Sequence, residues 1–65
     1  MPYVSIRVAG QLNREQKAEI CEGVTAVIAK AANKPKESII IFIDEEDRDN
    51  ISKGGVLMSD LVKQV

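Results

Sequence analysis

The segment Ser38–Ile43 constrains the fold more strongly than any other part of this chain. Five consecutive residues, Ile39 to Ile43, are apolar, which is typical of a strand that is covered on both faces. An alternating segment, Tyr3–Val8, predicts another strand, and a helical repeat of apolar residues lies between the two. One helix covers only one face of a two-stranded sheet. We therefore expect another copy of the chain to cover the other face.

The predicted helix runs over about Arg14–Ala32. Asn13 and Gln16 are three residues apart, a capping-box pair that starts a helix, and Asn33 with Pro35 ends it. Its apolar side chains recur at helical spacing, with Cys21 at the border of the stripe: Ile20, Val24, Val27, Ile28 and Ala31. A strand, a helix and a strand in this order form a crossover in which the strands are parallel. The predicted fold class is α+β: an oligomeric β-α-β protomer with two parallel strands, one long helix and a short C-terminal hairpin or tail.

The remainder of the chain predicts a loop and a small C-terminal element. Asp44–Asp49 is acidic but lacks the glycine and glutamate positions of an EF-hand, so we interpret it as a solvated loop. Asn50–Gly55 predicts a tight turn or small hairpin. Val56–Val65 is an apolar tail, either one helical turn or a strand. We expect a single domain over residues 1–65.

The chain is short for a domain that has no disulfide or metal site to stabilise it. A chain of 65 residues buries only about 60% of its unfolded surface. Cys21 is the only cysteine and there is no histidine, which excludes disulfides within one chain, makes a zinc site very unfavourable and rules out histidine-activated nucleophiles. We predict no metal and no cofactor, and we expect self-assembly to stabilise the fold.

Charge and hydropathy narrow the class of partners. Nine Lys and Arg residues against ten Asp and Glu residues give a formal charge of −1, with no basic cluster of the kind that binds nucleic acid. No apolar run is long enough to span a membrane, and the start of the chain does not resemble an export signal. With one free thiol, the expected compartment is the cytoplasm.

Pro2 is the strongest candidate for a catalytic residue. Removal of Met1 turns its nitrogen into a secondary amine, and an α-amino group has a pKa of about 7.7–8.0. An apolar pocket lowers that pKa further, which yields a general base near neutral pH. With Met1 retained, the same nitrogen is an amide without useful basicity. The alternative is that a Met-Pro start has no functional meaning.

Two cations are candidates for binding a carboxylate. Arg7 lies on the face of the first strand opposite its apolar residues, where it either binds an anion or keeps an edge strand soluble. Lys53 precedes Gly54–Gly55, where it either points across a pocket or remains a solvated turn residue. The sequence alone leaves both alternatives open.

Taken together, these residues resemble the tautomerase superfamily, in particular its small 4-oxalocrotonate tautomerase group. The resemblance covers nearly the whole chain, and it is carried by Met1-Pro2, Glu15-Gln16-Lys17, Pro35, Ser38 and Gly54-Gly55. It implies a homo-oligomer, a dimer or a trimer of dimers. It also implies that Pro2 acts as the general base in keto–enol or double-bond isomerisation of an unsaturated 2-oxo acid.

The chain also departs from the family pattern. The two arginines that bind carboxylates in the parent enzymes are replaced by Leu12 and Ile40, and an aromatic residue of the cavity wall is replaced by Ile51. We expect Leu12, Ser38, Ile40 and Ile51 to line the substrate cavity, with Lys53 or Arg7 as the remaining partner of one carboxylate. A small 2-oxo acid or enol with one carboxylate is therefore the expected substrate. The alternative is a non-catalytic, oligomeric small-acid-binding or structural relative.

Overall fold

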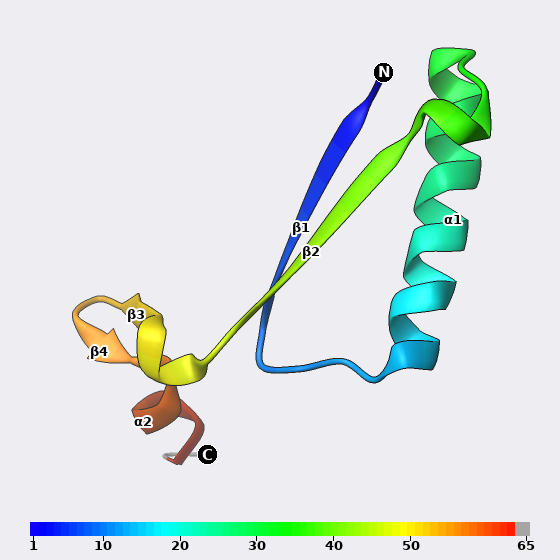
Figure 1. Cartoon of the computed structure of the whole chain (residues 1–65). Coiled ribbons are helices and arrows are strands. Elements are labelled where there is room, and N and C mark those ends of the chain that lie inside the picture. The colour runs from blue at the N-terminus through cyan, green and yellow to red at the C-terminus, as the bar shows by residue number, and fades with distance from the viewer. Residues whose placement is uncertain (64–65) are drawn as a thin grey trace.

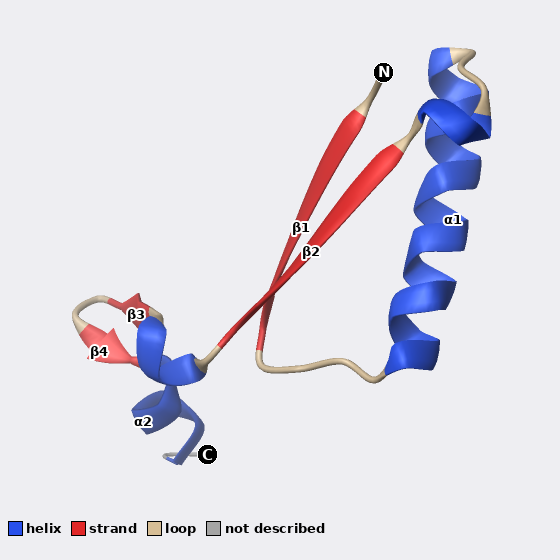
Figure 2. Ribbon diagram, viewed as in Figure 1, coloured by secondary structure: helices blue, strands red, loops and turns tan. Residues whose placement is uncertain are grey.

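The structure is a computed structural model that describes residues 1–63. Figures 1 and 2 show a two-stranded sheet and a long helix beside it. A small C-terminal unit lies beyond the carboxyl-terminal end of the sheet. The strands of the sheet are β1 (Tyr3–Ala9) and β2 (Ile40–Glu46), and α1 (Arg14–Ala32) connects them. β1 and β2 are parallel, so the β-α-β prediction is confirmed.

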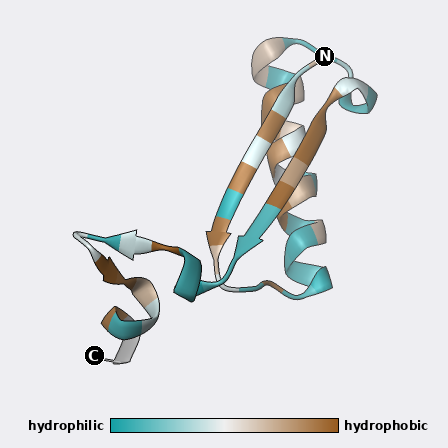
Figure 3. Cartoon of the chain, turned by 60° about the vertical axis from the view of Figure 1, so that its left-hand side comes forward, coloured by the Kyte–Doolittle hydropathy of each residue, from teal (hydrophilic) through white to brown (hydrophobic). Residues whose placement is uncertain are grey.

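The two faces of the sheet are chemically different, and the register shows which residues share each face. Tyr3 is opposite Ile40, and Ala9 is opposite Glu46. Along β1 from Tyr3 to Val8, residues that point to one face are half-buried and those that point to the other are exposed, as the alternation predicts. The face that carries the exposed residues of β1 is here called the open face, and it consists of Tyr3, Ser5, Arg7, Ala9, Ile40, Phe42, Asp44 and Glu46, of which Ala9, Ile40 and Glu46 are half-buried. Figure 3 shows that β2 changes from hydrophobic to hydrophilic along its length.

Helix α1 begins and ends where the sequence indicates. The Asn13 side chain accepts a hydrogen bond from the Gln16 backbone N–H, and the Gln16 side chain accepts one from Asn13, so both halves of the capping box form. Asn33 adopts the left-handed conformation that ends the helix. The predicted apolar stripe is wrong at two residues, because Val27, which is 67% exposed, and Ala31 both face solvent.

The second strand is shifted relative to its prediction. Ser38 does not begin it but closes a short 3₁₀ turn, η1 (Lys36–Ser38), where its hydroxyl and backbone N–H both donate to the Pro35 carbonyl. A serine hydroxyl can bond to the carbonyl three residues before it, and here this local bond competes with the strand ladder. At its other end the strand continues through Asp44–Glu46, so the acidic loop is shorter than predicted. These acidic residues pair with Arg7–Ala9 of β1, and that pairing keeps them extended.

The C-terminal unit is a hairpin followed by a short helix. After the 3₁₀ turn η2 (Arg48–Asn50), β3 (Ser52–Lys53) pairs antiparallel with β4 (Val56–Leu57). Both turn glycines have positive φ, 62° at Gly54 and 84° at Gly55, as a two-residue hairpin turn requires. The predicted tail, Val56–Val65, is divided between β4 and α2 (Met58–Lys63), and its last two residues lie outside the described part of the chain. The Met58 backbone N–H donates to the Ile51 carbonyl.

A single chain does not enclose a core. Among the residues whose burial is described, 1–61, none is fully buried. The radius of gyration is 15.2 Å, whereas a compact chain of this length has about 11 Å. Large apolar side chains remain exposed on the open face, including Tyr3 and Phe42. Within residues 1–63 no helix has both the length and the apolar character needed to span a membrane.

Candidate active site

Pro2 lies at the start of the sheet, where the backbone is fixed. Its carbonyl accepts a 3.0 Å hydrogen bond from the Ile40 backbone N–H, which extends the β1–β2 ladder to this residue. The ring is half-buried, whereas the Met1 side chain before it is 71% exposed. The rings of Tyr3 and Phe42 lie beside each other on the open face, with centroids 6.5 Å apart. The amino-terminal end of the sheet is therefore ordered and largely apolar.

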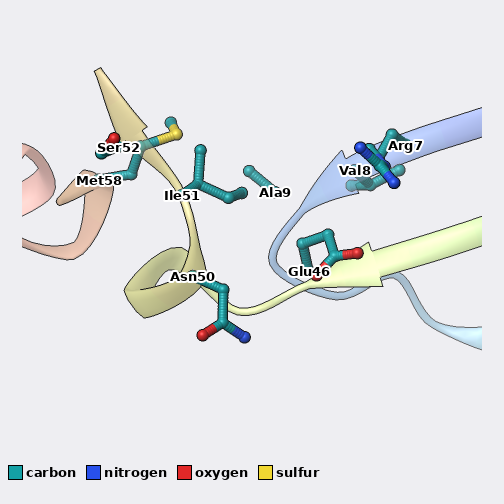
Figure 4. Close-up of a pocket in the computed structure, with 8 residues that line it drawn as sticks. All are labelled: Arg7, Val8, Ala9, Glu46, Asn50, Ile51, Ser52 and Met58. Atoms are coloured by element: carbon teal, nitrogen blue, oxygen red, sulfur yellow. The ribbon is translucent and has the colours of Figure 1, made fainter. Parts of the chain in front are cut away.

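A hollow of about 560 Å³ lies at the opposite end of the sheet, between the last residues of the sheet and the hairpin. Figure 4 shows Arg7, Val8 and Glu46 on the sheet side, and Ile51, Ser52 and Met58 on the hairpin side. Its volume is in the range of small-molecule sites. Its lining combines one guanidinium, one carboxylate, an amide and a hydroxyl with apolar side chains: Arg7, Val8, Ala9, Glu46, Asn50, Ile51, Ser52 and Met58.

Arg7 is the cation of this hollow. Two carboxylates lie near it on the same face, because Asp44 is opposite Arg7 in the ladder and Glu46 is two pairs further along. Within the described part of the chain, Arg7 forms no ion pair at 4 Å or less. Its five N–H donors are therefore available to a planar carboxylate. The negative charges of Asp44 and Glu46 oppose the binding of a second carboxylate.

The connection between β1 and α1 is fixed at the same end of the sheet. The Leu12 backbone N–H donates to Glu45 Oε2 at 2.8 Å, and Lys17 Nζ lies 2.7 Å from Glu45 Oε1. The pKa of the Glu45 carboxyl is lowered below its ordinary value of 4.5. The hydrogen bond from Lys17 is the largest cause, and the one from the Leu12 backbone is the next largest. The loop that carries Leu12 is thus tied to the end of β2.

The predicted site residues fall into two groups within one chain. Pro2, Ser38 and Ile40 lie at the amino-terminal end of the sheet, and Leu12, Ile51 and Lys53 lie beyond its carboxyl-terminal end. Arg7 and Ile51 line the hollow, whereas Leu12 and Lys53 do not, and Lys53 is exposed on β3. Along β1, Pro2 and Ala9 are separated by about 23 Å, at about 3.3 Å per residue. One chain therefore does not bring its own candidates together.

Several residues of this region escaped the sequence analysis. Asn50, Ser52 and Met58 line the hollow because the hairpin folds back toward the sheet, and no local pattern indicates that approach. The role of Glu45 was missed because its partners are 28 and 33 residues away in the chain. Cys21 is half-buried on α1 and does not line the hollow. Within residues 1–63, no group of three or more cysteine and acidic side chains is arranged to hold a metal ion.

Comparison with known proteins connects this arrangement to one family. The family described as "Tautomerase enzyme" matches residues 2–61. A "Probable tautomerase" of Bacillus cereus is 35% identical over 60 residues, which cover 92% of this chain and 98% of the relative. The "2-hydroxymuconate tautomerase" of Bacillus subtilis is 31% identical over 61 residues, which cover 94% of this chain and 98% of that protein.

A solved structure has the same fold. The heterohexameric 4-oxalocrotonate tautomerase of Chloroflexus aurantiacus superimposes with a TM-score of 0.85 at 28% sequence identity. The match covers 94% of this chain and 98% of the solved chain. The strands, long helix and C-terminal hairpin described above therefore correspond to those of a solved protein along almost the whole length.

Proposed function

This chain belongs to the tautomerase family, and we propose that it is an isomerase that moves a proton within an enol or an unsaturated 2-oxo acid. The family makes it an isomerase in general, and the substrate class is the proposal. A relative named 2-hydroxymuconate tautomerase supports that class, because its substrate is an enol acid. The observation that carries the proposal is the hollow in which Arg7 faces apolar side chains and the donors Asn50 and Ser52.

Pro2 is the proposed general base. Met1 is 71% exposed, so it is accessible for removal, and its loss leaves a secondary amine on a ring whose carbonyl is held in the sheet. The amine must be neutral to accept a proton, and the apolar residues at this end of the sheet favour the neutral form. In the proposed reaction the Pro2 nitrogen takes the hydroxyl proton of the enol. As the C–O bond becomes a carbonyl, the protonated amine returns the proton to carbon.

The active site is proposed to lie between two copies of the chain. The Pro2 nitrogen must approach the reacting atoms to hydrogen-bond distance, about 3 Å, whereas the hollow of the same chain begins five residues along the strand. A second copy related by a two-fold axis perpendicular to the strands runs antiparallel to the first. It places the Pro2 end of one copy beside the hollow of the other, twice per dimer. The heterohexamer of Chloroflexus aurantiacus supports assembly as a property of this fold.

The proposed substrate carries one carboxylate. Arg7 is the anchor for that group, and the guanidinium also stabilises the negative charge that develops on the oxygen next to it during proton transfer. Asp44 and Glu46 lie on the same face and repel a second anionic group. Leu12 and Ile40, which replace the parent arginines, favour an apolar end of the substrate. Lys53 is exposed, and we assign it no more than a place at the rim.

A second function is favoured by those same two replacements. Without the parent arginines at Leu12 and Ile40, the chain retains a hollow for an acid but has fewer groups to stabilise the charge of a reaction. Such a chain would be an oligomer that binds a small acid without converting it. The two functions differ in whether Pro2 is needed for turnover.

The test compares the mature protein with Pro2→Ala, both with an intact mass that verifies the loss of Met1. The substrates are 2-hydroxymuconate, with two carboxylates, and enol-phenylpyruvate, with one. We expect turnover of the monoacid to exceed that of the diacid, and Pro2→Ala to lower kcat by about a hundredfold or more. Ketonisation at equal rates by the two proteins would refute the isomerase and favour the binding function. A native protein that retains Met1 would refute it as well.

A further inference from the structure

Glu45 is an acidic side chain whose two oxygens are both held by residues from distant parts of the chain. Oε2 accepts from the Leu12 backbone N–H at 2.8 Å, and Oε1 accepts from Lys17 Nζ at 2.7 Å. The Lys17 and Glu45 side chains are 36% and 26% exposed, so both are partly covered. The carboxylate thus joins the end of β2 to the loop before α1 and to the first turn of α1.

The backbone of that loop is fixed at three points. The Gly10 backbone N–H donates to the Glu46 carbonyl at 2.7 Å, and the Asn13 backbone N–H donates to the Gln16 side chain at 2.9 Å. Between them, the Leu12 N–H donates to Glu45. The first bond continues the strand ladder and the second belongs to the helix cap. The bond to Glu45 is the one that holds the Leu12 backbone itself to the sheet.

We propose that Glu45 is a positioning residue of the substrate cavity, and that Lys17 orients its carboxylate toward the Leu12 N–H. The inference rests on the proposed function, in which Leu12 forms part of the apolar wall that receives the end of the substrate away from Arg7. Glu45 does not touch the substrate or take part in proton transfer. Its carboxylate holds the loop so that the Leu12 side chain stays at the wall, and Lys17 keeps that carboxylate from turning to solvent.

The test separates the two bonds with four variants. Glu45→Ala removes both bonds, Lys17→Met removes the ion pair alone, and Glu45→Gln keeps an oxygen that can accept from Leu12. Glu22→Ala, at an exposed acidic residue of α1, is the control. We expect Glu45→Ala to raise KM for enol-phenylpyruvate about tenfold, the effect of losing one charge-assisted hydrogen bond, with kcat within about twofold. Glu45→Gln and Lys17→Met should each raise KM by less than that.

Hydrogen exchange of the Leu12 amide gives a readout that does not depend on activity. The amide should be protected in the unmodified chain and in Glu45→Gln, and it should exchange much faster in Glu45→Ala. If Pro2→Ala is inactive but Glu45→Ala leaves KM or the exchange of Leu12 unchanged, the inference is overturned and the proposed function stands. If Pro2→Ala is as active as the unmodified protein, the proposed function fails, and the placement of Leu12 in a substrate cavity fails with it.

Discussion

The open face of the sheet leads to a quantitative prediction about assembly. Phe42 lies in the middle of this face and is 55% exposed in one chain. An aromatic side chain buries about 200 Å² when covered, so a partner copy covers about 110 Å² more of Phe42. At about 25 cal/mol per Å², Phe42→Ala costs about 2 kcal/mol of association per chain, after allowance for the remaining Cβ. A symmetric dimer loses this contact twice, which weakens its Kd about a thousandfold.

Sedimentation velocity over a series of protein concentrations measures this change. The unmodified chain should remain assembled at micromolar concentration, and Phe42→Ala should dissociate there and melt at a temperature that depends on concentration. Val27→Ala is the matched control, because Val27 is also a large exposed apolar residue but lies on α1. Its association should stay unchanged. A monomeric unmodified chain with a cooperative melt, or a Phe42→Ala variant that assembles normally, would refute the reasoning.

Three further predictions concern the cap, the ion pair and the hollow. Asn13→Ala removes the side-chain acceptor of the α1 cap and should lower the free energy of unfolding by about 1 kcal/mol in denaturant titrations; an unchanged midpoint would contradict the role of the cap. Because the pKa of Glu45 is lowered in the folded chain, the stability that it contributes is present above its ordinary value of 4.5 and is lost as pH falls through the lowered value. Melting temperatures of the unmodified chain and Glu45→Gln should thus converge only in acid, and a difference that persists at the lowest pH would contradict the assignment. Arg7→Gln should raise KM for a monoacid about tenfold or more, whereas Lys53→Gln, on an exposed strand, should change it little.

Much of the fold could be predicted because its signals are local. The alternation of Tyr3–Val8, the capping box of α1 and the glycine pair of the hairpin each depend on residues close together in sequence. All three predictions are confirmed in type and position. The open face was likewise predictable, because one helix cannot cover both faces of two strands.

The errors arise where tertiary contacts or local hydrogen bonds override the pattern. Asp44–Glu46 looks like a solvated loop by composition, yet pairing with β1 holds these residues in a strand. Ser38 was predicted to begin the second strand, yet its hydroxyl closes a turn onto Pro35. For the site, Leu12 and Ile51 were predicted by resemblance, but their distance from Pro2 within one chain follows only from the parallel register.

The central claim is that Pro2 and Arg7 act on the same substrate from different chains. Pro2→Ala and Arg7→Ala proteins, each with kcat/KM lowered about tenfold or more, should be unfolded together, refolded as a random mixture and assayed with a monoacid. Random pairing makes about half of the dimers mixed, with one chain of each variant. In a mixed dimer, one of the two sites has both Pro2 and Arg7, so about a quarter of the unmodified activity should return. Activity in the mixture no greater than that of the two variants alone would contradict the shared site.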